Sequence, residues 1–411
     1  MNEYFIKPVD LLRMHEGPLG FCIDAFSALL HEQGFAPPSA RRQMRLVSEF
    51  SRWLHRNGFG VQDVSPNKAD RFVKCRFRDF HPQSGDLAAL RRLVGLLYRM
   101  GIIACPEPTR IETACDGILD GYQAYLSHER ALSPATLENY LPFARQLLIE
   151  RFPGSKIEVS QLCAADITGF VQRHAQCLSR KRALLMTSAL RSFLRFLYQS
   201  GDIRTQLAAC VPTVPSWSLS DIPKYIQPSE VQRILDNCDR MTAVGRRDYA
   251  ILLLLARLGL RAGEVAFLKL EDIDWQAGHI TIQGKGGRSD VFPMETEIGE
   301  AIVDYLQNGR PCCSSRCVFV RSAAPRTGFV THTAIGTIVK RALARAQINS
   351  PNKGAHLLRH TLATQMMQQG ASLAEIGEIL RHRHLNTTVL YAKVDLSGLR
   401  TIAPPWPGGA Q

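Results

Sequence analysis

The most informative stretch of the chain is DYAILLLLARLGLRAGE, at residues 248–264. Its first part, 248–258, is almost entirely apolar, which predicts a helix buried on all sides. The longest apolar run, 250–256, ends at Arg257 and is far too short to span a bilayer. Directly after the predicted helix, Arg261 stands between two glycines. The stretch therefore predicts a buried helix that delivers one arginine at its end.

The segments that follow predict a small sheet among helices. Residues 279–282 and 290–293 flank the sequence GKGG at 284–287, a pattern typical of a β-hairpin with Lys285 near its tip. Further helices are expected at 333–346 and, as three short helices, within 354–392. Two helix starts have capping-box patterns, one at Ser229 to Gln232 and one at Ser372 with Glu375.

The first half of the chain predicts helices only. In 39–57, on a strongly basic segment, apolar residues recur at helical spacing: Met44, Val47, Phe50 and Leu54. Residues 87–100 repeat this character and stop at Gly101. Further along, Ser133 before Pro134 marks another helix start. The expected fold class is therefore mainly α, with a small β-sheet in the C-terminal domain.

The pattern divides the chain into several parts. These are an extra N-terminal helical domain (1–105), a second helical domain (110–203), a proline-containing linker (204–227), a C-terminal domain (223–403) and a loose tail (404–411). LRRLVGLLYR at 90–99 and LRSFLRFLYQ at 190–199 each run into a glycine. Either the two helical domains are repeats of one design, or two amphipathic helices have a similar composition by convergence.

Charge points to a polyanionic partner. The 411 residues include 50 Lys and Arg against 37 Asp and Glu, a net charge of +13. Clustered positive charge gains affinity by releasing counterions from phosphates, so nucleic acid or an anionic membrane surface would fit. The eleven scattered cysteines indicate free thiols, and the first residues lack a secretion signal. We expect a cytoplasmic, nucleoid-associated protein.

Six residues of the C-terminal domain form an ordered set: Arg261, Lys285, His356, Arg359, His382 and Tyr391. A glycine-flanked arginine, a lysine in Gly-Lys-Gly, His-x-x-Arg, a second histidine and then a tyrosine resemble the pattern of the tyrosine recombinases, or phage integrase family. The resemblance covers about 223–395, and 110–203 resembles the family's SAM-like core-binding domain. It implies a mixed α/β catalytic domain preceded by a helical DNA-binding domain.

The resemblance also implies roles for these residues. Tyr391 would attack phosphorus and carry a covalent 3′-phosphotyrosyl link, while Arg261 and Arg359, assisted by His382, would clamp the phosphate. Lys285 would protonate the leaving 5′-oxygen, and His356 would accept the tyrosine proton. Planar arginines suit the non-bridging oxygens because they bind bidentately. No metal or other cofactor is implied, because the arginines supply the positive charge that a two-metal nuclease takes from its ions.

Each residue has an ordinary structural interpretation as well. Tyr391 could pack in a core, Lys285 could be a solvated turn residue, and Arg261 could interact with a helix C-terminus. The histidines near 356–384 could suggest zinc, but partners at ligand spacing are missing. Only the family pattern accounts for the whole ordered set. Glu264 and His360 are interpreted as structural support.

One position departs from the family pattern. Members commonly have glycine before the second histidine, whereas this chain has Arg381. The side chain would either add a phosphate contact or crowd the site. Basic side chains on predicted helices supply further DNA-binding candidates: Arg41, Arg42, Arg45, Arg180, Lys181, Arg182 and Arg191.

The expected function is site-specific recombination of double-stranded DNA for a mobile element, by a tetramer on two sites or with companion recombinases. Two alternatives stay open. One is a catalytically silent DNA-binding accessory protein of a transposon, and the other is an enzyme similar to type IB topoisomerases.

Overall fold

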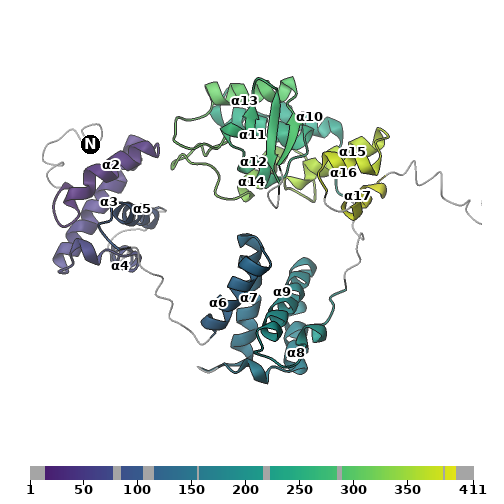
Figure 1. Ribbon diagram of the computed structural model, residues 1–411. Helices are drawn as coiled ribbons and strands as arrows, with labels where there is room; N and C mark the ends of the chain where they lie inside the picture. Colours follow the sequence, from purple (N-terminus) through teal and green to yellow (C-terminus); the bar gives the residue numbers. More distant parts are fainter. Residues whose placement is uncertain are drawn as a thin grey trace, which may run out of the picture. The chain divides into compact units, whose positions relative to one another are not determined.

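The computed structural model describes residues 14–76, 85–104, 115–154, 157–215, 223–284, 289–382 and 385–394. The chain divides into two compact units, one made of residues 1–104 with 221–411 and the other of residues 105–220. Helices dominate both, and the described strands form one antiparallel sheet (Figure 1). The predicted fold class is therefore confirmed. No helix in these ranges is long and apolar enough to cross a membrane.

Residues 14–104 form a helical body around their own hydrophobic core. Its helices are α2 (Ile23–Glu32), α3 (Pro37–Arg56), α4 (Pro66–Arg76) and α5 (Asp86–Arg99), with short 3-10 turns at Gly20–Cys22 and Val61–Asp63. The four apolar residues expected on one face of α3 are fully buried, as the helical spacing predicted. Its basic residues Arg41, Arg42 and Arg45 lie on the exposed side.

Residues 115–215 form a second helical body with a separate core. Its helices are α6 (Asp116–Ala124), which continues into a wider turn at Tyr125–Glu129, then α7 (Pro134–Arg151), α8 (Ala164–Ala175) and α9 (Arg180–Gln199), with 3-10 turns at Val159–Gln161 and Leu207–Cys210. Ser133 is the N-cap residue of α7 and Pro134 its first residue, as expected. Leu207 and Val211 are buried in this core, so the packed body extends past α9.

The two helical bodies have the same order of elements. In each, a short helix precedes a long helix that begins with proline, then come a 3-10 turn, a third helix and a final helix that ends before a glycine. The glycines Gly101 and Gly201 have φ of 68° and 83°. Their amides donate to the carbonyls of Tyr98 and Tyr198 at 3.0 and 3.2 Å. The similarity between the two sequence segments thus extends to the way both final helices end.

The C-terminal part, residues 223–394, has a third core built around α11. Its helices are α10 (Pro228–Asp236), α11 (Ala243–Arg257), α12 (Ala262–Ala266), α13 (Thr296–Asn308), α14 (Thr333–Arg345), α15 (His356–Gln368), α16 (Leu373–Ile379) and α17 (Leu385–Ala392), with a 3-10 turn at Leu270–Asp272. Residues 250–255 of α11 are completely buried, which confirms the prediction from their apolar character.

The sheet confirms the expected hairpin. β2 (His279–Gln283) pairs antiparallel with β3 (Ser289–Pro293), with Ile280 opposite Phe292, and β1 (Ile273–Asp274) pairs with the other edge of β2. The sequence pattern missed β1 because two residues are too short to show alternation. Lys285, predicted near the tip of the hairpin, lies outside the described residues.

One predicted helix start is wrong by two residues. The capping box of α10 uses Gln227 as N-cap, whose amide donates to Glu230 Oε2 at 2.8 Å, so Ser229 lies inside the first turn. Pro228 explains the shift, because proline is favoured at the first helical position, where no amide hydrogen is needed. The capping box at Ser372 and Glu375 is confirmed.

Candidate active site

Arg261 reaches the site through a turn that requires glycine. Gly259 follows α11 with φ of +59°, and a Cβ at this position would approach Leu380 Cδ2 to 2.9 Å. Glycine alone combines this left-handed conformation with so little space. The chain can therefore turn out of the buried helix and place Arg261 as the residue before α12.

Glu264 fixes Arg261 from inside α12. Its carboxylate accepts the Arg261 backbone amide at 2.7 Å and Arg261 Nη1 at 2.8 Å. The side chain of Glu264 is 7% exposed, whereas that of Arg261 is 38% exposed. The predicted supporting role of Glu264 thus has a structural basis, and part of the arginine remains open to a ligand.

Arg359 connects the Arg261 turn with the segment before His382. It lies on α15, is 4% exposed, and donates from its two terminal nitrogens to the carbonyls of Gly259 and Leu380. Burial lowers the pKa of Arg359 to about 10, and the positive charge of Arg261 acts in the same direction. The guanidinium therefore stays charged at neutral pH.

Tyr391 lies on α17 and is 1% exposed. Its hydroxyl is hydrogen-bonded to Nδ1 of His360 at 2.9 Å. The ring of His382 lies parallel to the tyrosine ring, with centroids 6.3 Å apart. Burial raises the pKa of Tyr391 to about 12, against the opposing effect of the Arg359 charge. The hydroxyl therefore keeps its proton at neutral pH unless a base takes it.

Two histidines of the site are neutral at physiological pH. Burial lowers the pKa of His360 to about 4, helped by the charges of His356 and Arg359. Burial also lowers the pKa of His382 to about 4, helped by Arg359 and Arg261. Nδ1 of His382 is hydrogen-bonded to Thr388 at 2.8 Å. A neutral imidazole at His360 can accept the proton of a tyrosine.

His356 occupies a different environment. It is the first residue of α15 and is exposed, and its ring centroid lies 6.4 Å from that of His360. The structure therefore brings His360 to the hydroxyl of Tyr391, a contact that the sequence did not predict. A signal existed, because residues 356 and 360 are four apart and lie on one face of a helix.

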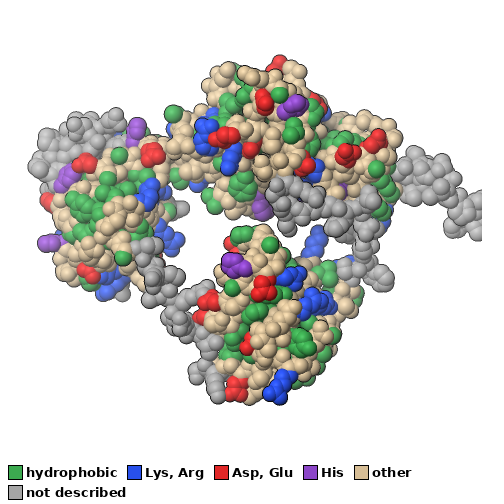
Figure 2. Space-filling model, viewed as in Figure 1, with side chains coloured by type: hydrophobic (Ala, Val, Ile, Leu, Met, Phe, Trp, Pro, Cys, Tyr) green, Lys and Arg blue, Asp and Glu red, His purple; other side chains and the backbone are tan. Residues whose placement is uncertain are grey.

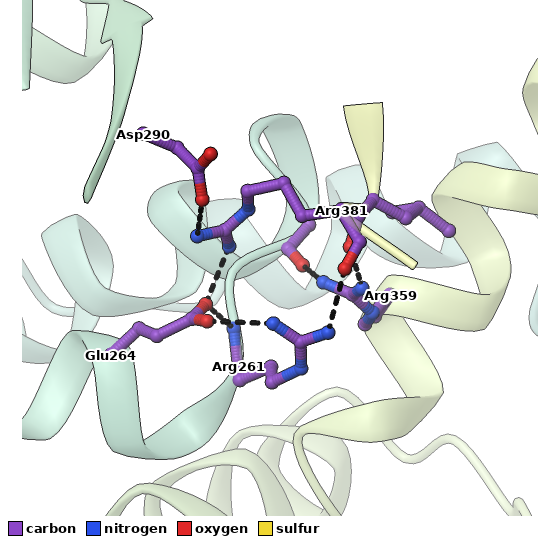
Figure 3. Close-up of polar contacts among 7 residues, drawn as sticks. Arg261, Glu264, Asp290, Arg359 and Arg381 are labelled. Atoms are coloured by element: carbon purple, nitrogen blue, oxygen red, sulfur yellow. Dashed lines mark hydrogen bonds and ion pairs between the residues drawn. The ribbon is translucent and has the colours of Figure 1, made fainter. Parts of the chain in front are cut away.

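Arg381 points away from solvent. Its guanidinium lies between Glu264 and Asp290, on the side of the site where Glu264 also holds Arg261 (Figure 3). The side chain is 10% exposed. The guanidinium is therefore engaged with two carboxylates of the protein, and the phosphate contact suggested by the sequence stays a prediction. Asp290 and Thr388 were not singled out from the sequence, because no local pattern indicates that they contact Arg381 and His382.

A cavity of about 550 Å³ lies beside Arg261. It runs from α12 to the end of β2 and is lined in part by Arg261, Lys269, Phe267 and Gln283. Among the residues that the structure describes, no group of histidine, cysteine and carboxylate side chains could hold a metal ion.

The candidate DNA-binding residues fall into two groups. Arg41, Arg42, Arg45, Arg180 and Lys181 are exposed, and Figure 2 shows Lys and Arg side chains on both helical bodies. Arg180, although exposed, also donates from Nε to the carbonyl of Pro215 at 3.0 Å. Arg182 and Arg191 are only partly exposed and are hydrogen-bonded within the second body. Arg182 donates to Asn139 at 2.9 Å, and Arg191 donates to the carbonyls of Val211 and Pro212 at 3.0 and 3.2 Å.

Family models match two regions of the chain. Residues 224–397 match the phage integrase family, and residues 119–201 match the phage integrase N-terminal SAM-like domain. Over the full length of both chains, the protein is 46% identical to y4rA of Sinorhizobium fredii, which is named as an integrase/recombinase. It is 33% identical to the tyrosine recombinase XerC of Shewanella amazonensis, with 69% of this chain and 93% of the relative covered.

Solved structures share the fold. A XerH site-specific recombinase bound to its difH substrate matches with a TM-score of 0.54 and 18% identity, over 80% of this chain and 92% of the other. A lambda integrase dimer bound to a COC′ core site matches with a TM-score of 0.52 and 16% identity, over 74% and 86%. The full-length similarity, together with the converging arginines, histidines and tyrosine, shows that the chain belongs to the phage integrase family of tyrosine recombinases.

Proposed function

We propose that the protein is a site-specific DNA recombinase that breaks and rejoins strands through a covalent 3′-phosphotyrosyl intermediate. One observation carries this proposal. Arg359 on α15 donates to the carbonyl of Gly259, 100 residues away, and to that of Leu380. His360 on the same helix is hydrogen-bonded to the hydroxyl of Tyr391. The helix α15 therefore brings together the segments that carry Arg261, His382 and Tyr391. A tyrosine beside two arginines matches the needs of phosphoryl transfer, which are a nucleophile and fixed positive charge.

In this proposal Tyr391 attacks the scissile phosphorus, and its proton passes to a histidine. The 5′-oxygen leaves with a proton. The bond energy is kept, because one phosphodiester in the DNA is exchanged for another in the phosphotyrosyl link. Arg261 and Arg359 neutralise the non-bridging oxygens, with His382 assisting. Lys285 is proposed as the proton donor on the family resemblance alone. The reverse attack by a 5′-hydroxyl on the phosphotyrosyl link would rejoin the strands and release the tyrosine.

The proton acceptor has two candidates. The family resemblance assigns this role to His356, whereas the hydrogen bond to Tyr391 supports His360. We favour His360, because a general base must lie within hydrogen-bond reach of the proton that it takes. His356, four residues earlier on the same face of α15, would then relay the proton toward solvent.

The pH dependence of cleavage distinguishes the two histidines. His360→Ala should slow single-turnover cleavage at pH 7 by about 10²-fold or more. Wild-type cleavage should vary little between pH 6 and 8, since the pKa of His360 is already lowered to about 4. In His360→Ala the rate should rise about tenfold per pH unit, because only tyrosinate reacts and the pKa of Tyr391 is about 12. His356→Ala is the matched control, and a steep profile there instead would assign the base to His356.

The two helical bodies are proposed to bind duplex DNA together with the catalytic domain. Their common order of elements supports the view that 1–105 is a duplicated core-binding domain, next to the core-binding domain at 110–203. The catalytic domain is proposed to span 223–403, after the linker at 204–227, with a tail at 404–411. Exposed arginines on α3 and the first residues of α9 would contact phosphates, which position a protein without reading the sequence.

Removal of charge from α3 should weaken DNA binding in a salt-dependent way. Replacement of Arg41, Arg42 and Arg45 with glutamine should lower affinity and reduce the slope of log affinity against log salt by about 0.9 for each phosphate that is no longer neutralised. Lysine at the same three positions keeps the charge and should retain most of the affinity. Fluorescence anisotropy over a salt series measures both. Equal slopes for the glutamine variant and wild type would exclude α3 from the DNA interface.

The proposed assembly is a tetramer on two DNA sites, alone or with companion recombinases, in the service of a mobile element. Two other functions fit less well. An accessory protein would bind DNA without cleaving it, and the buried Tyr391–His360 pair would then have no function. A topoisomerase would relax plasmids of any sequence.

The test is a covalent-trapping assay with nicked duplexes taken from the flanks of the gene. A denaturation-resistant adduct on the 3′ end of one specific flank would support the recombinase. Binding to the flanks without an adduct would support the accessory protein, and relaxation of arbitrary plasmid would support the topoisomerase.

A further inference from the structure

Arg381 occupies a position where a side chain is unfavourable. Its φ is +51°, in the left-handed region that glycine adopts freely and other residues rarely do. The family pattern has glycine at this position. A chain that places arginine here gives up conformational energy, so the contacts of the side chain must offset that loss.

The Arg381 side chain joins three segments of the catalytic domain. Nη2 lies 2.6 Å from Glu264 Oε2, at α12, and Nη1 lies 3.6 Å from Asp290 Oδ2, on β3. The guanidinium also stacks over the ring of Phe292, with its central carbon 4.8 Å from the ring centroid. These contacts bury the charge and commit it to the protein (Figure 3).

Glu264 is shared between two arginines with different exposure. Oε1 accepts Nη1 of Arg261, while Oε2 accepts the Arg261 amide and Nη2 of Arg381. Burial alone would raise the pKa of Glu264, but the Arg261 amide and the charges of both arginines hold it below its ordinary range. The carboxylate is therefore ionised and needs positive charge beside it.

Arg381 also contacts Arg261 directly. Its backbone carbonyl accepts Nη2 of Arg261 at 3.2 Å, across 120 residues of sequence. Arg381 thus orients Arg261 through its carbonyl, and its guanidinium binds Glu264 Oε2, which from Arg261 accepts only the backbone amide. Without that guanidinium, Arg261 could close a bidentate pair on Glu264, and the charge of the carboxylate would be balanced by Arg261 alone.

We propose that Arg381 is a positioning residue that neutralises Glu264 and thereby keeps the guanidinium of Arg261 directed to the scissile phosphate. This inference rests on the proposed function, because it assigns Arg261 to the phosphate. In this proposal Arg381 acts through Glu264 and not by binding the phosphate itself. The arginine that departs from the family pattern then balances the charge of the buried carboxylate beside it. With three positive charges (Arg261, Arg359 and Arg381) and two negative ones (Glu264 and Asp290), this group of side chains keeps a net positive charge.

The test compares Arg381→Gly with the double variant Arg381→Gly, Glu264→Gln in the full chain. Glycine relieves the backbone conformation, so folding should be retained. Single-turnover cleavage of the nicked duplex should fall by about 10²-fold in Arg381→Gly, as expected when a donor to the transition state is misplaced. DNA affinity should change by less than about threefold, since only the transition state is affected. Glu264→Gln should restore at least about tenfold of the missing rate, because the uncompensated charge has been removed.

A duplex with a methylphosphonate at the scissile position gives an independent readout. The methyl group removes the negative charge that Arg261 neutralises, so the difference between wild type and Arg381→Gly should shrink to a few-fold. Equal slowing on both duplexes, or no rescue by Glu264→Gln, would reduce Arg381 to a structural residue and overturn the inference. If wild type forms a normal adduct and Arg381→Gly cleaves at the same rate as wild type, the inference about Arg381 is overturned but the proposed function is not. A wild-type chain without any adduct would overturn the proposed function as well.

Discussion

Tyr391→Phe should abolish the covalent protein–DNA adduct and leave folding and DNA affinity close to wild type. The tyrosine ring is 1% exposed and packs beside the ring of His382. Phenylalanine keeps the ring and its packing and removes only the hydroxyl with its hydrogen bond to His360. The loss of one such bond should cost about 1 kcal/mol. Removal of a nucleophile should lower cleavage by more than about 10⁴-fold, below detection.

The adduct is measured on denaturing gels after incubation with the nicked duplex that wild type cleaves. Tyr305→Phe is a matched control, because Tyr305 is also 1% exposed and its hydroxyl accepts the Val320 amide at 3.3 Å. This variant should lose similar stability but retain the adduct. An adduct that persists in Tyr391→Phe would mean that another residue attacks the DNA.

Arg359→Lys should lower cleavage by about 10²- to 10³-fold, although it preserves the charge. Arg359 uses two nitrogens to reach the carbonyls of Gly259 and Leu380. A lysine ammonium is a single point on a flexible chain and cannot match this planar fork. At least one buried carbonyl should lose its donor, which should lower the free energy of unfolding by about 1–3 kcal/mol.

Urea unfolding and single-turnover cleavage, measured on the same preparation, separate these two effects. Arg247→Lys provides the comparison, because Arg247 is 8% exposed and is bound to Asp248 and the carbonyl of Val320 outside the site. It should lose stability without a comparable loss of cleavage by the folded protein. Cleavage at the wild-type rate in Arg359→Lys would argue against a phosphate clamp formed by Arg359.

Local sequence was sufficient for most elements of the fold. The helical spacing of apolar residues predicted α3, and a nearly continuous apolar run predicted the buried helix α11. The two segments on either side of the glycine-rich sequence 284–287 predicted the β2–β3 hairpin. The start of α10 was predicted two residues late, since Pro228 competes with Ser229 for the helix start. β1 was missed, because its two residues owe their strand conformation to pairing with β2.

The order of residue types along the chain was sufficient to identify the candidate catalytic side chains. The order was informative because it resembles the pattern of the tyrosine recombinases, whereas phosphoryl transfer by itself restricts only the residue types. Local rules also implied that His356 and His360 share one face of α15. They could not indicate which of the two meets Tyr391, because that contact depends on how α17 packs against α15.

From the amino-acid sequence, periodicity and composition predicted the fold class, and the ordered motif indicated the family and the candidate catalytic residues through its resemblance to the tyrosine recombinases. The partners of those residues were established by the packing of the folded domain. It pairs Tyr391 with His360, turns Arg381 inward to Glu264 and Asp290, and lets Arg359 hold Gly259 and Leu380 together. Arg381 and Arg359 lie up to 120 residues away in sequence from the groups that they bind. Their contacts therefore depend on the packing of the whole domain and leave no local signal in the sequence.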